Sequence, residues 1–172
     1  MKQRWLTLFR CAIMVALVMV VVGCGDDSSD KKSKWVSDPD FPTADPGGGQ
    51  VLLSRDGTER LIRGTFLNNV TLDSAHDWYM QGSVFIGDDS VANSATITIE
   101  AGTTIYGMNG TPPGALIITR NSQIDADGTE TNPIVFTSPL ATPSRGDWGG
   151  IVINGNAIVN SCGTGPCTGT QA

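Results

Sequence analysis

The chain has 172 residues, 40% hydrophobic and 16% charged, and a formal net charge of −6 at pH 7. Its length suffices for one domain with a sizeable core, and its 21 glycines and many β-branched residues favour short strands and tight turns over a helical fold. The acidic balance argues against a nucleic-acid partner, because binding to phosphates requires clusters of Lys and Arg.

Residues 1–23 have the features of a secretory signal peptide. Lys2, Arg4 and Arg10 make its start basic, and residues 11–22 form an unbroken apolar run. This run is too short for a retained transmembrane helix, which needs about 20 apolar residues. Without residues 1–23 the chain has a formal charge of −9, so we expect no electrostatic attachment to anionic lipid.

Residues 21–24, Val-Val-Gly-Cys, resemble the lipobox of bacterial lipoproteins. The resemblance implies cleavage between Gly23 and Cys24, and acylation of Cys24 with fatty acids such as palmitate. Several acyl chains anchor a protein stably to a membrane, whereas one chain binds only reversibly. In enteric bacteria an Asp directly after the cysteine tends to mark inner-membrane retention. Gly25 occupies that position here, so the resemblance implies an outer-membrane lipoprotein of the cell envelope.

Residues 24–50, which begin with the lipidated cysteine, are predicted to form a flexible linker. The segment is polar and rich in Pro and Gly, so it buries too little apolar surface to offset the entropy lost on ordering. Trp35 and Phe41 are interpreted as incidental aromatic residues, with a role as anchors for a partner as the alternative. Such a linker would hold the folded domain away from the lipid headgroups.

A short apolar pattern occurs three times between residues 95 and 160. Its positions follow each other at steps of 19 and then 35 residues: Ile97, Ile99 and Ile105; Leu116, Ile118 and Ile124; Ile151, Ile153 and Val159. A constant internal spacing across unequal insertions is typical of a solenoid, in which coils stack while their loops vary. We therefore predict an all-β solenoid domain over residues 51–160, with the coils stacked in this register.

The strand segments between residues 75 and 160 resemble those of right-handed parallel β-helix proteins with a pectin-lyase-like fold. The resemblance rests on a set of segments, residues 78–86, 96–107, 115–118, 133–138 and 145–153. It extends to a group of bacterial envelope lipoproteins and secreted proteins, and it implies a right-handed parallel β-helix. The alternative is a β-sandwich, which also uses short strands at regular spacing.

Two sets of residues are candidates for covalent or metal chemistry. Cys162 and Cys167 enclose a four-residue loop with Gly and Pro, and in an oxidising compartment we expect a disulfide between them. A metal site is the alternative, but no histidine lies nearby to complete a tetrahedral ligand set. Asp125, Asp127 and Glu130 follow the order of part of a calcium loop. We interpret them as turn residues, with calcium binding as the alternative.

The sequence shows no recognisable catalytic set, and no cofactor is expected. The single histidine, His76, lies beside Asp77, but a Gly-x-Ser-x-Gly motif is lacking. The acids assigned to the coils do not repeat at one coil position: Glu100, Asp125, Asp127 and Glu130. Enzyme activity is therefore not favoured on this evidence.

We predict a lipid-anchored, non-catalytic β-helix protein of the bacterial envelope that acts in surface adhesion or binds polysaccharide. Its partners would be the membrane, through the lipid anchor, and a polysaccharide or cell-surface molecule. The alternative is a carbohydrate-active enzyme of the pectate-lyase or glycoside-hydrolase type, with active-site coils beyond residue 172. Residues 161–172 are typical of a loop and not of the cap that a solenoid needs, so we expect the chain to be an N-terminal fragment.

Overall fold

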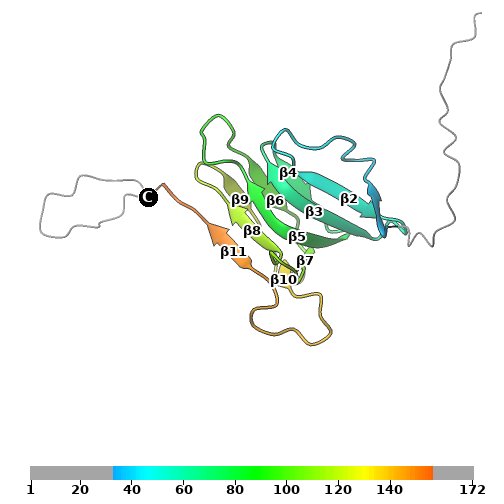
Figure 1. Cartoon of the computed structure of the whole chain (residues 1–172). Coiled ribbons are helices and arrows are strands. Elements are labelled where there is room, and N and C mark those ends of the chain that lie inside the picture. The colour runs from blue at the N-terminus through cyan, green and yellow to red at the C-terminus, as the bar shows by residue number, and fades with distance from the viewer. Residues whose placement is uncertain (1–32, 157–172) are drawn as a thin grey trace, which may run out of the picture. The chain divides into compact units, whose positions relative to one another are not determined.

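A computed structural model describes residues 33–156, which form eleven strands in two sheets (Figure 1). The predicted signal peptide, Gly23, Cys24 and the pair Cys162 and Cys167 lie outside the described residues. Within residues 33–156 there is no helix, which confirms the predicted all-β class. That part of the chain accordingly contains no helix long and apolar enough to cross a membrane.

The larger sheet has eight strands and the smaller sheet has three. The larger sheet contains β1 (Trp35–Ser37), β2 (Gln50–Ser54), β3 (Glu59–Phe66), β5 (Asp77–Ile86), β7 (Thr104–Gly107), β8 (Ala115–Ile118), β10 (Val135–Thr137) and β11 (Gly150–Ile153). The smaller sheet contains β4 (Val70–Leu72), β6 (Thr96–Ile99) and β9 (Gln123–Asp125). The pairs β1–β2 and β2–β3 are antiparallel, and the pairs that follow β3 are parallel. Parallel pairing disfavours the β-sandwich, which is built from antiparallel strands.

The chain crosses the sheets in four successive passes. The first pass contains β3 and β4, the second β5 and β6, the third β7, β8 and β9, and the fourth β10 and β11. The long strand β5 carries β7 along its first half and β8 along its second half, because Trp78 pairs with Ile105 and Val84 pairs with Leu116. Gly82, between the two halves, has a φ of 66°, a conformation that glycine adopts without steric cost.

The predicted repeat register is confirmed at one step and wrong at the other. Leu116 and Ile118 of β8 pair with Ile151 and Ile153 of β11, so these two pairs of the second predicted step are correct. Val159, the predicted equivalent of Ile124, lies outside the described residues. Ile97 of β6, however, pairs with Ile124 of β9, and β8 pairs with β5. The smaller sheet therefore repeats from Val70 to Ile97 to Ile124, a longer step than the one predicted from Ile97 to Leu116. The prediction failed because strands of both sheets alternate apolar and polar residues, and this period of two does not reveal which sheet a strand joins.

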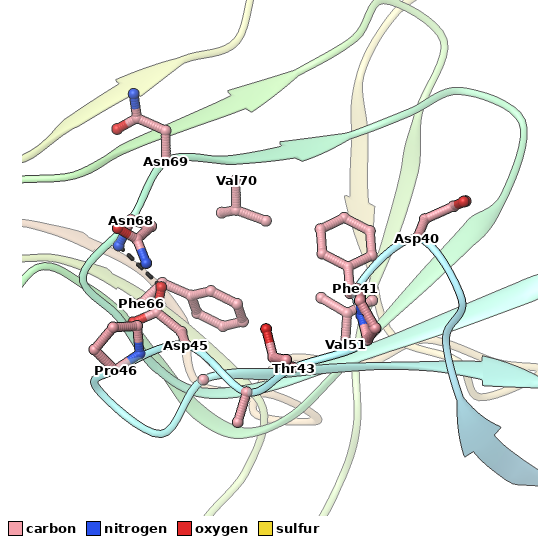
Figure 2. Close-up of a pocket in the computed structure, with 13 residues that line it drawn as sticks. Asp40, Phe41, Thr43, Asp45, Pro46, Val51, Phe66, Asn68, Asn69 and Val70 are labelled. Atoms are coloured by element: carbon pink, nitrogen blue, oxygen red, sulfur yellow. Dashed lines mark hydrogen bonds between the residues drawn. The ribbon is translucent and has the colours of Figure 1, made fainter.

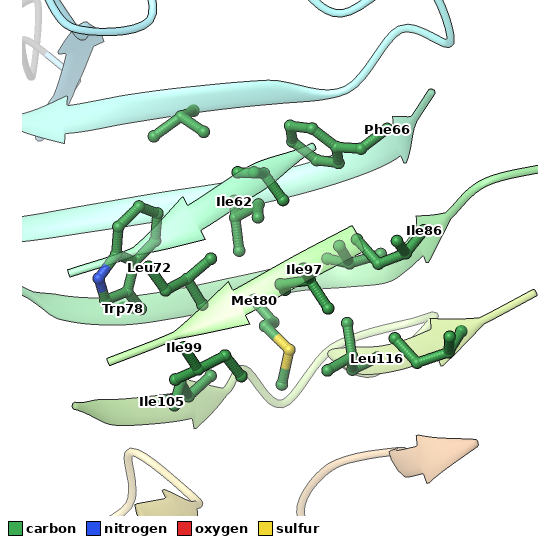
Figure 3. Close-up of a cluster of buried hydrophobic side chains, with 14 of the residues drawn as sticks. Ile62, Phe66, Leu72, Trp78, Met80, Ile86, Ile97, Ile99, Ile105 and Leu116 are labelled. Atoms are coloured by element: carbon green, nitrogen blue, oxygen red, sulfur yellow. The ribbon is translucent and has the colours of Figure 1, made fainter. Parts of the chain in front are cut away.

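The core lies between the inward faces of the two sheets (Figure 3). Trp78 and Met80 of β5 contribute from the larger sheet, and Ile97 and Ile99 of β6 contribute from the smaller sheet. The fully buried Trp78 is the largest of these side chains. Alternate residues of a strand point to opposite faces, so Tyr79, between Trp78 and Met80, points outward.

A ladder of polar side chains follows one corner of the passes. Asp89, after β5, and Asn121, after β8, have left-handed backbone conformations with φ values of 69° and 68°. Asn121 Nδ2 donates a hydrogen bond to the Asp89 carbonyl at 3.0 Å, and Asn156 Nδ2 donates to Asn121 Oδ1 at 2.6 Å. Asn and Asp adopt this conformation more readily than other side chains do. The ladder therefore links three successive passes at equivalent turns.

Residues 33–49, which we call the N-terminal strap, differ from the flexible linker that the sequence predicts for residues 24–50. β1 pairs with β2, and Asp38 is fully buried with its Oδ2 2.8 Å from Arg60 Nε. Phe41 packs against the core. The strap is ordered because its few apolar and acidic side chains find partners on the first pass. Such long-range partners are not visible in local composition.

Candidate functional site

A row of aromatic side chains crosses the outward face of the larger sheet. It contains Trp35 of β1, Tyr79 of β5 and Tyr106 of β7, each of them half-buried. Tyr79 and Tyr106 are paired residues of adjacent strands, and their rings stack with centroids 4.9 Å apart. The Trp35 and Tyr79 centroids are 5.9 Å apart, with the ring planes inclined at 56°. The three rings thus form a continuous surface feature.

Two carboxylates lie beside this row at one position of successive passes. Glu59 opens β3 and Asp77 opens β5, and the two residues are paired directly across the parallel strands. Neighbouring strands are about 4.8 Å apart, so the two acids form a close pair on the sheet. We call Lys34, Trp35, Glu59, Asp77, Tyr79 and Tyr106 the aromatic strip.

Sequence reasoning missed this pair because it searched for repeated acids only among the passes after residue 95. A sequence pattern that indicates the pair was present, since Glu59 precedes Leu61 by the same interval that separates Asp77 from Tyr79. Leu61 and Tyr79 are themselves paired. An alignment of β3 with β5 that superposes Leu61 on Tyr79 would have brought the two acids together.

The tyrosine hydroxyls of the strip lie in a negative environment. Partial burial, followed by the negative charge of Glu59, raises the pKa of Tyr79 to about 12. Burial and the charges of Asp77 and Glu59 also raise the pKa of Tyr106. Both hydroxyls therefore keep their protons at physiological pH and can donate hydrogen bonds.

Lys34 supplies the cation of the strip. Its ammonium group pairs with the Glu59 carboxylate, and it lies 5.2 Å from the centroid of the Trp35 ring and 5.5 Å from that of Tyr79. A cation over an aromatic face is attracted by the electrons of the ring. Glu59 is thus already engaged by Lys34, whereas Asp77 is exposed and forms no ion pair among the described residues.

A cavity of about 430 Å³ lies between the N-terminal strap and the first pass (Figure 2). Its volume falls in the range of about 300–1,000 Å³ that is common for small-molecule sites. Phe41 and Phe66 contribute apolar surface, and Thr43 and Asn68 contribute polar groups. We call it the strap cavity.

Asp45 also lines the strap cavity, but its carboxylate serves the fold. Burial alone would raise the pKa of Asp45, but hydrogen bonds from the backbone N–H groups of Leu67, Gly47 and Asn68 outweigh it and lower the pKa. Those donors lie 2.7 Å, 2.9 Å and 3.0 Å from the carboxylate oxygens. Asp45 therefore fixes the strap to the turn after β3.

Residues 64–171 match the model of a protein family described as the pectate-lyase-like β-helix domain. The chain belongs to this family. No curated protein and no solved structure matched the chain. The match includes Asp77, Tyr79 and Tyr106 of the aromatic strip. It leaves out the N-terminal strap and Glu59, so this β-helix family member builds its strip partly from residues that the family model does not include.

Beneath the strap of this β-helix family member, Arg60 forms a buried ion cluster. The Arg60 side chain is only 6% exposed, and it pairs with the carboxylates of Asp38, Asp40 and Asp73. Its guanidinium carbon lies 5.5 Å from the centroid of the Trp78 ring. The cluster joins the strap, β3 and the turn after β4, so we assign it a structural role.

The single histidine belongs to the same cluster. His76 Nδ1 lies 2.6 Å from Asp73 Oδ1, so its side-chain partner is Asp73 and not the adjacent Asp77. Asp73 in turn pairs with Arg60. This arrangement contains carboxylates, one guanidinium and one imidazole but no nucleophilic side chain, and it offers no triad for acyl transfer.

The acids that were candidates for calcium binding do not come together in this β-helix family member. Asp125 ends β9, Asp127 and Glu130 lie in the loop that follows, and all three are exposed. Among residues 33–156, no three His, Cys, Asp or Glu side chains are grouped so that they could hold a metal ion. Glu59 and Asp77, in contrast, are paired directly on adjacent strands.

Proposed function

We propose that this protein is a lipid-anchored, right-handed parallel β-helix of the bacterial outer membrane that binds polysaccharide through the aromatic strip without cleaving it. The signal peptide over residues 1–23 and acylation of Cys24 are parts of the proposal that rest on the sequence. The carbohydrate-related family and the parallel passes support the β-helix and its class of ligand.

The observation that carries the proposal is the aromatic strip itself. A sugar presents hydroxyl groups that donate and accept hydrogen bonds, together with apolar C–H faces. The strip offers the carboxylate of Asp77 as an acceptor, the hydroxyl of Tyr106 as a donor, and the exposed parts of the rings. Because these groups come from adjacent strands, an extended chain of sugars could contact several of them in succession.

The absence of cleavage in this proposal follows from how Glu59 is held. Glycosidases use two carboxyl groups, one of which must give its proton to the leaving oxygen. Glu59 is engaged by the Lys34 ammonium and by a hydrogen bond with Tyr79. Only Asp77 of the pair is open to a ligand, so the strip is suited to binding and not to two-carboxylate hydrolysis.

The binding surface is tested by titrating the purified protein with a panel of soluble polysaccharides in a calorimeter. Tyr106→Ala should weaken binding by tenfold or more, which is about 1.4 kcal/mol. The matched control is Phe85→Ala, because Phe85 is an exposed aromatic residue on the other half of β5 and lies outside the strip. Unchanged binding in Tyr106→Ala would refute the proposal. A loss in Thr43→Ala but not in Tyr106→Ala would place the ligand in the strap cavity.

The absence of cleavage and the anchor need separate measurements. Prolonged incubation with each polysaccharide should release no new reducing ends and no unsaturated products. Product formation that disappears in Asp77→Asn would show that the protein is a carbohydrate-active enzyme instead. For the anchor, cells expressing the protein should incorporate labelled palmitate into it, and Cys24→Ala should abolish that label. Equal labelling of Cys24→Ala would exclude Cys24 as the lipidated residue.

A further inference from the structure

The aromatic strip already holds one ammonium group, that of Lys34. This ammonium lies over the faces of Trp35 and Tyr79 and pairs with Glu59. The side chain of Lys34 is 54% exposed and comes from the strap, at the edge of the sheet. The strip therefore provides the two features that bind an organic cation, an aromatic face and a carboxylate.

One step farther along the sheet the same combination occurs without a cation. Asp77 is paired with Glu59 across the strands, and the rings of Tyr79 and Tyr106 belong to β5 and β7, farther from the edge strand β1. Asp77 is exposed and has no ion pair among residues 33–156. This second position is open to a cation from outside the protein.

The surrounding charges favour a positive ligand at this second position. The negative charges of Glu59 and Asp77 contribute to the raised pKa of both tyrosines. The net charge of the whole chain is also negative, which attracts cations over longer distances. Two other exposed cations lie nearby. Arg55 donates from its Nε to the Ser33 carbonyl at 2.7 Å, and Arg63 donates from its guanidinium to the amide oxygens of Gln50 and Gln81. Arg63 lies beyond Leu61 along β3, away from the end of the strand that carries Glu59.

We infer that the polysaccharide bound by the aromatic strip carries protonated amino groups, as in a polymer of glucosamine, and that Asp77 with Tyr79 and Tyr106 receives one of them. This inference rests on the proposed function, because it names the ligand class of the same surface. It differs from what the name of the family suggests, since a polyuronate would bring carboxylates to Asp77 and Glu59.

A matched pair of ligands tests this inference. Glucosamine oligomers and the same oligomers after N-acetylation have equal length and linkage, and they differ in charge. At a pH where the free amines are protonated, the purified protein should bind the glucosamine oligomers about tenfold more tightly in calorimetry. Added salt should reduce this preference, because exposed charges are screened. Asp77→Asn should remove most of the preference, because it should weaken the binding of the glucosamine oligomers much more than that of the acetylated oligomers.

A second variant gives a result that a structural role alone would not produce. Lys34→Met removes the internal cation and leaves Glu59 free for a ligand amine, so the affinity for glucosamine oligomers should increase. Arg63→Met is the control, because it removes one positive charge from the same face, and it should change the affinity much less. Weaker binding in Lys34→Met, or an equal gain in both variants, would contradict the inference.

The outcomes separate the two proposals. Binding that depends on Tyr106 but is equal or tighter for the acetylated oligomers, or for polygalacturonate oligomers, would overturn the amino-sugar inference and keep the polysaccharide-binding function. If no oligomer or polysaccharide binds, or if binding is unchanged in Tyr106→Ala, the proposed function itself fails. Urea unfolding of each variant verifies that the affinity differences are measured on folded protein.

Discussion

Replacement of Arg60 by methionine should strongly destabilise the protein. Methionine preserves much of the aliphatic volume but leaves the fully buried Asp38 carboxylate without its cation. Removing one partner of a buried ion pair typically costs about 3–5 kcal/mol. Asp40 has a side chain that is 70% exposed and Asp73 one that is 26% exposed, so water can compensate these two. Most of the cost should therefore come from Asp38.

Urea unfolding, followed by tryptophan fluorescence, measures this loss. Trp78 is a suitable reporter, because its ring lies beside the Arg60 guanidinium in the core. With a slope of about 1–3 kcal/mol per molar urea, the expected loss moves the midpoint by about 1 M or more. Arg63→Met is the control on the same strand, and it should change the stability by about 0.5 kcal/mol or less because Arg63 is exposed.

The ion cluster also predicts that replacing its different members destabilises the protein by different amounts. Asp38→Asn leaves Arg60 with two carboxylates, Asp40 and Asp73, so it should cost less than Arg60→Met. The double variant should lose less than the sum of the single losses, since it removes both buried charges. If Arg60→Met were no more destabilising than Arg63→Met, the cluster would not anchor the strap and this reasoning would be refuted.

Three further outcomes follow from burial, backbone conformation and charge. Leu116→Ala should lower the free energy of unfolding by about 2–5 kcal/mol, because Leu116 is 1% exposed. The control Ile117→Ala should cost less, because Ile117 faces outward. Equal losses in urea unfolding would contradict the inward placement of Leu116. Asn121→Ala should lower the free energy of unfolding by about 1–3 kcal/mol in the same assay, because alanine at a φ of 68° is strained and lacks the ladder hydrogen bonds. Asn121→Gly relieves the strain but not the loss of the hydrogen bonds, so it should cost less than Asn121→Ala. An absorbance titration should place the pKa of Tyr79 at about 12, above the ordinary value of 10.0, because the side chain is partly buried and lies near the negative charge of Glu59. The contribution of Tyr79 to stability is therefore complete below pH 10 and is lost as the pH rises through 12. A pKa that Glu59→Gln does not lower would contradict the contribution assigned to Glu59.

The class of the fold could be predicted from local patterns, but the full register could not. Short β-branched runs between turn residues suffice to indicate strands, and the equivalence of Leu116 with Ile151 is correct. Ile97 and Leu116 look equivalent because each begins an alternating apolar run, although one lies in the smaller sheet and the other in the larger. Packing across the core decides which strands pair when passes differ in length. The alternation of apolar and polar residues within one strand carries no information about that pairing.

The aromatic strip was hidden for a related reason. Trp35 lies in a segment whose composition predicts disorder, yet the strap gains order from the distant partners Arg60 and Phe66. The step along the chain from Glu59 to Asp77 is shorter than the step from Tyr79 to Tyr106, although both are pairs on adjacent strands. Because passes differ in length, no single period aligns these residues, and only the three-dimensional pairing brings them together.

The short antiparallel strand β1 also bears on aggregation. An open edge of a sheet presents free N–H and C=O groups to which another molecule can add a strand. β1 offers only three residues, and it is followed by the buried Asp38 and by Pro39, which has no N–H to donate. Without β1 the edge would be β2, five residues of sequence Gln-Val-Leu-Leu-Ser. By covering the edge of β2, the strap therefore disfavours edge-to-edge association of neighbouring molecules, and this effect matters most at high protein concentration.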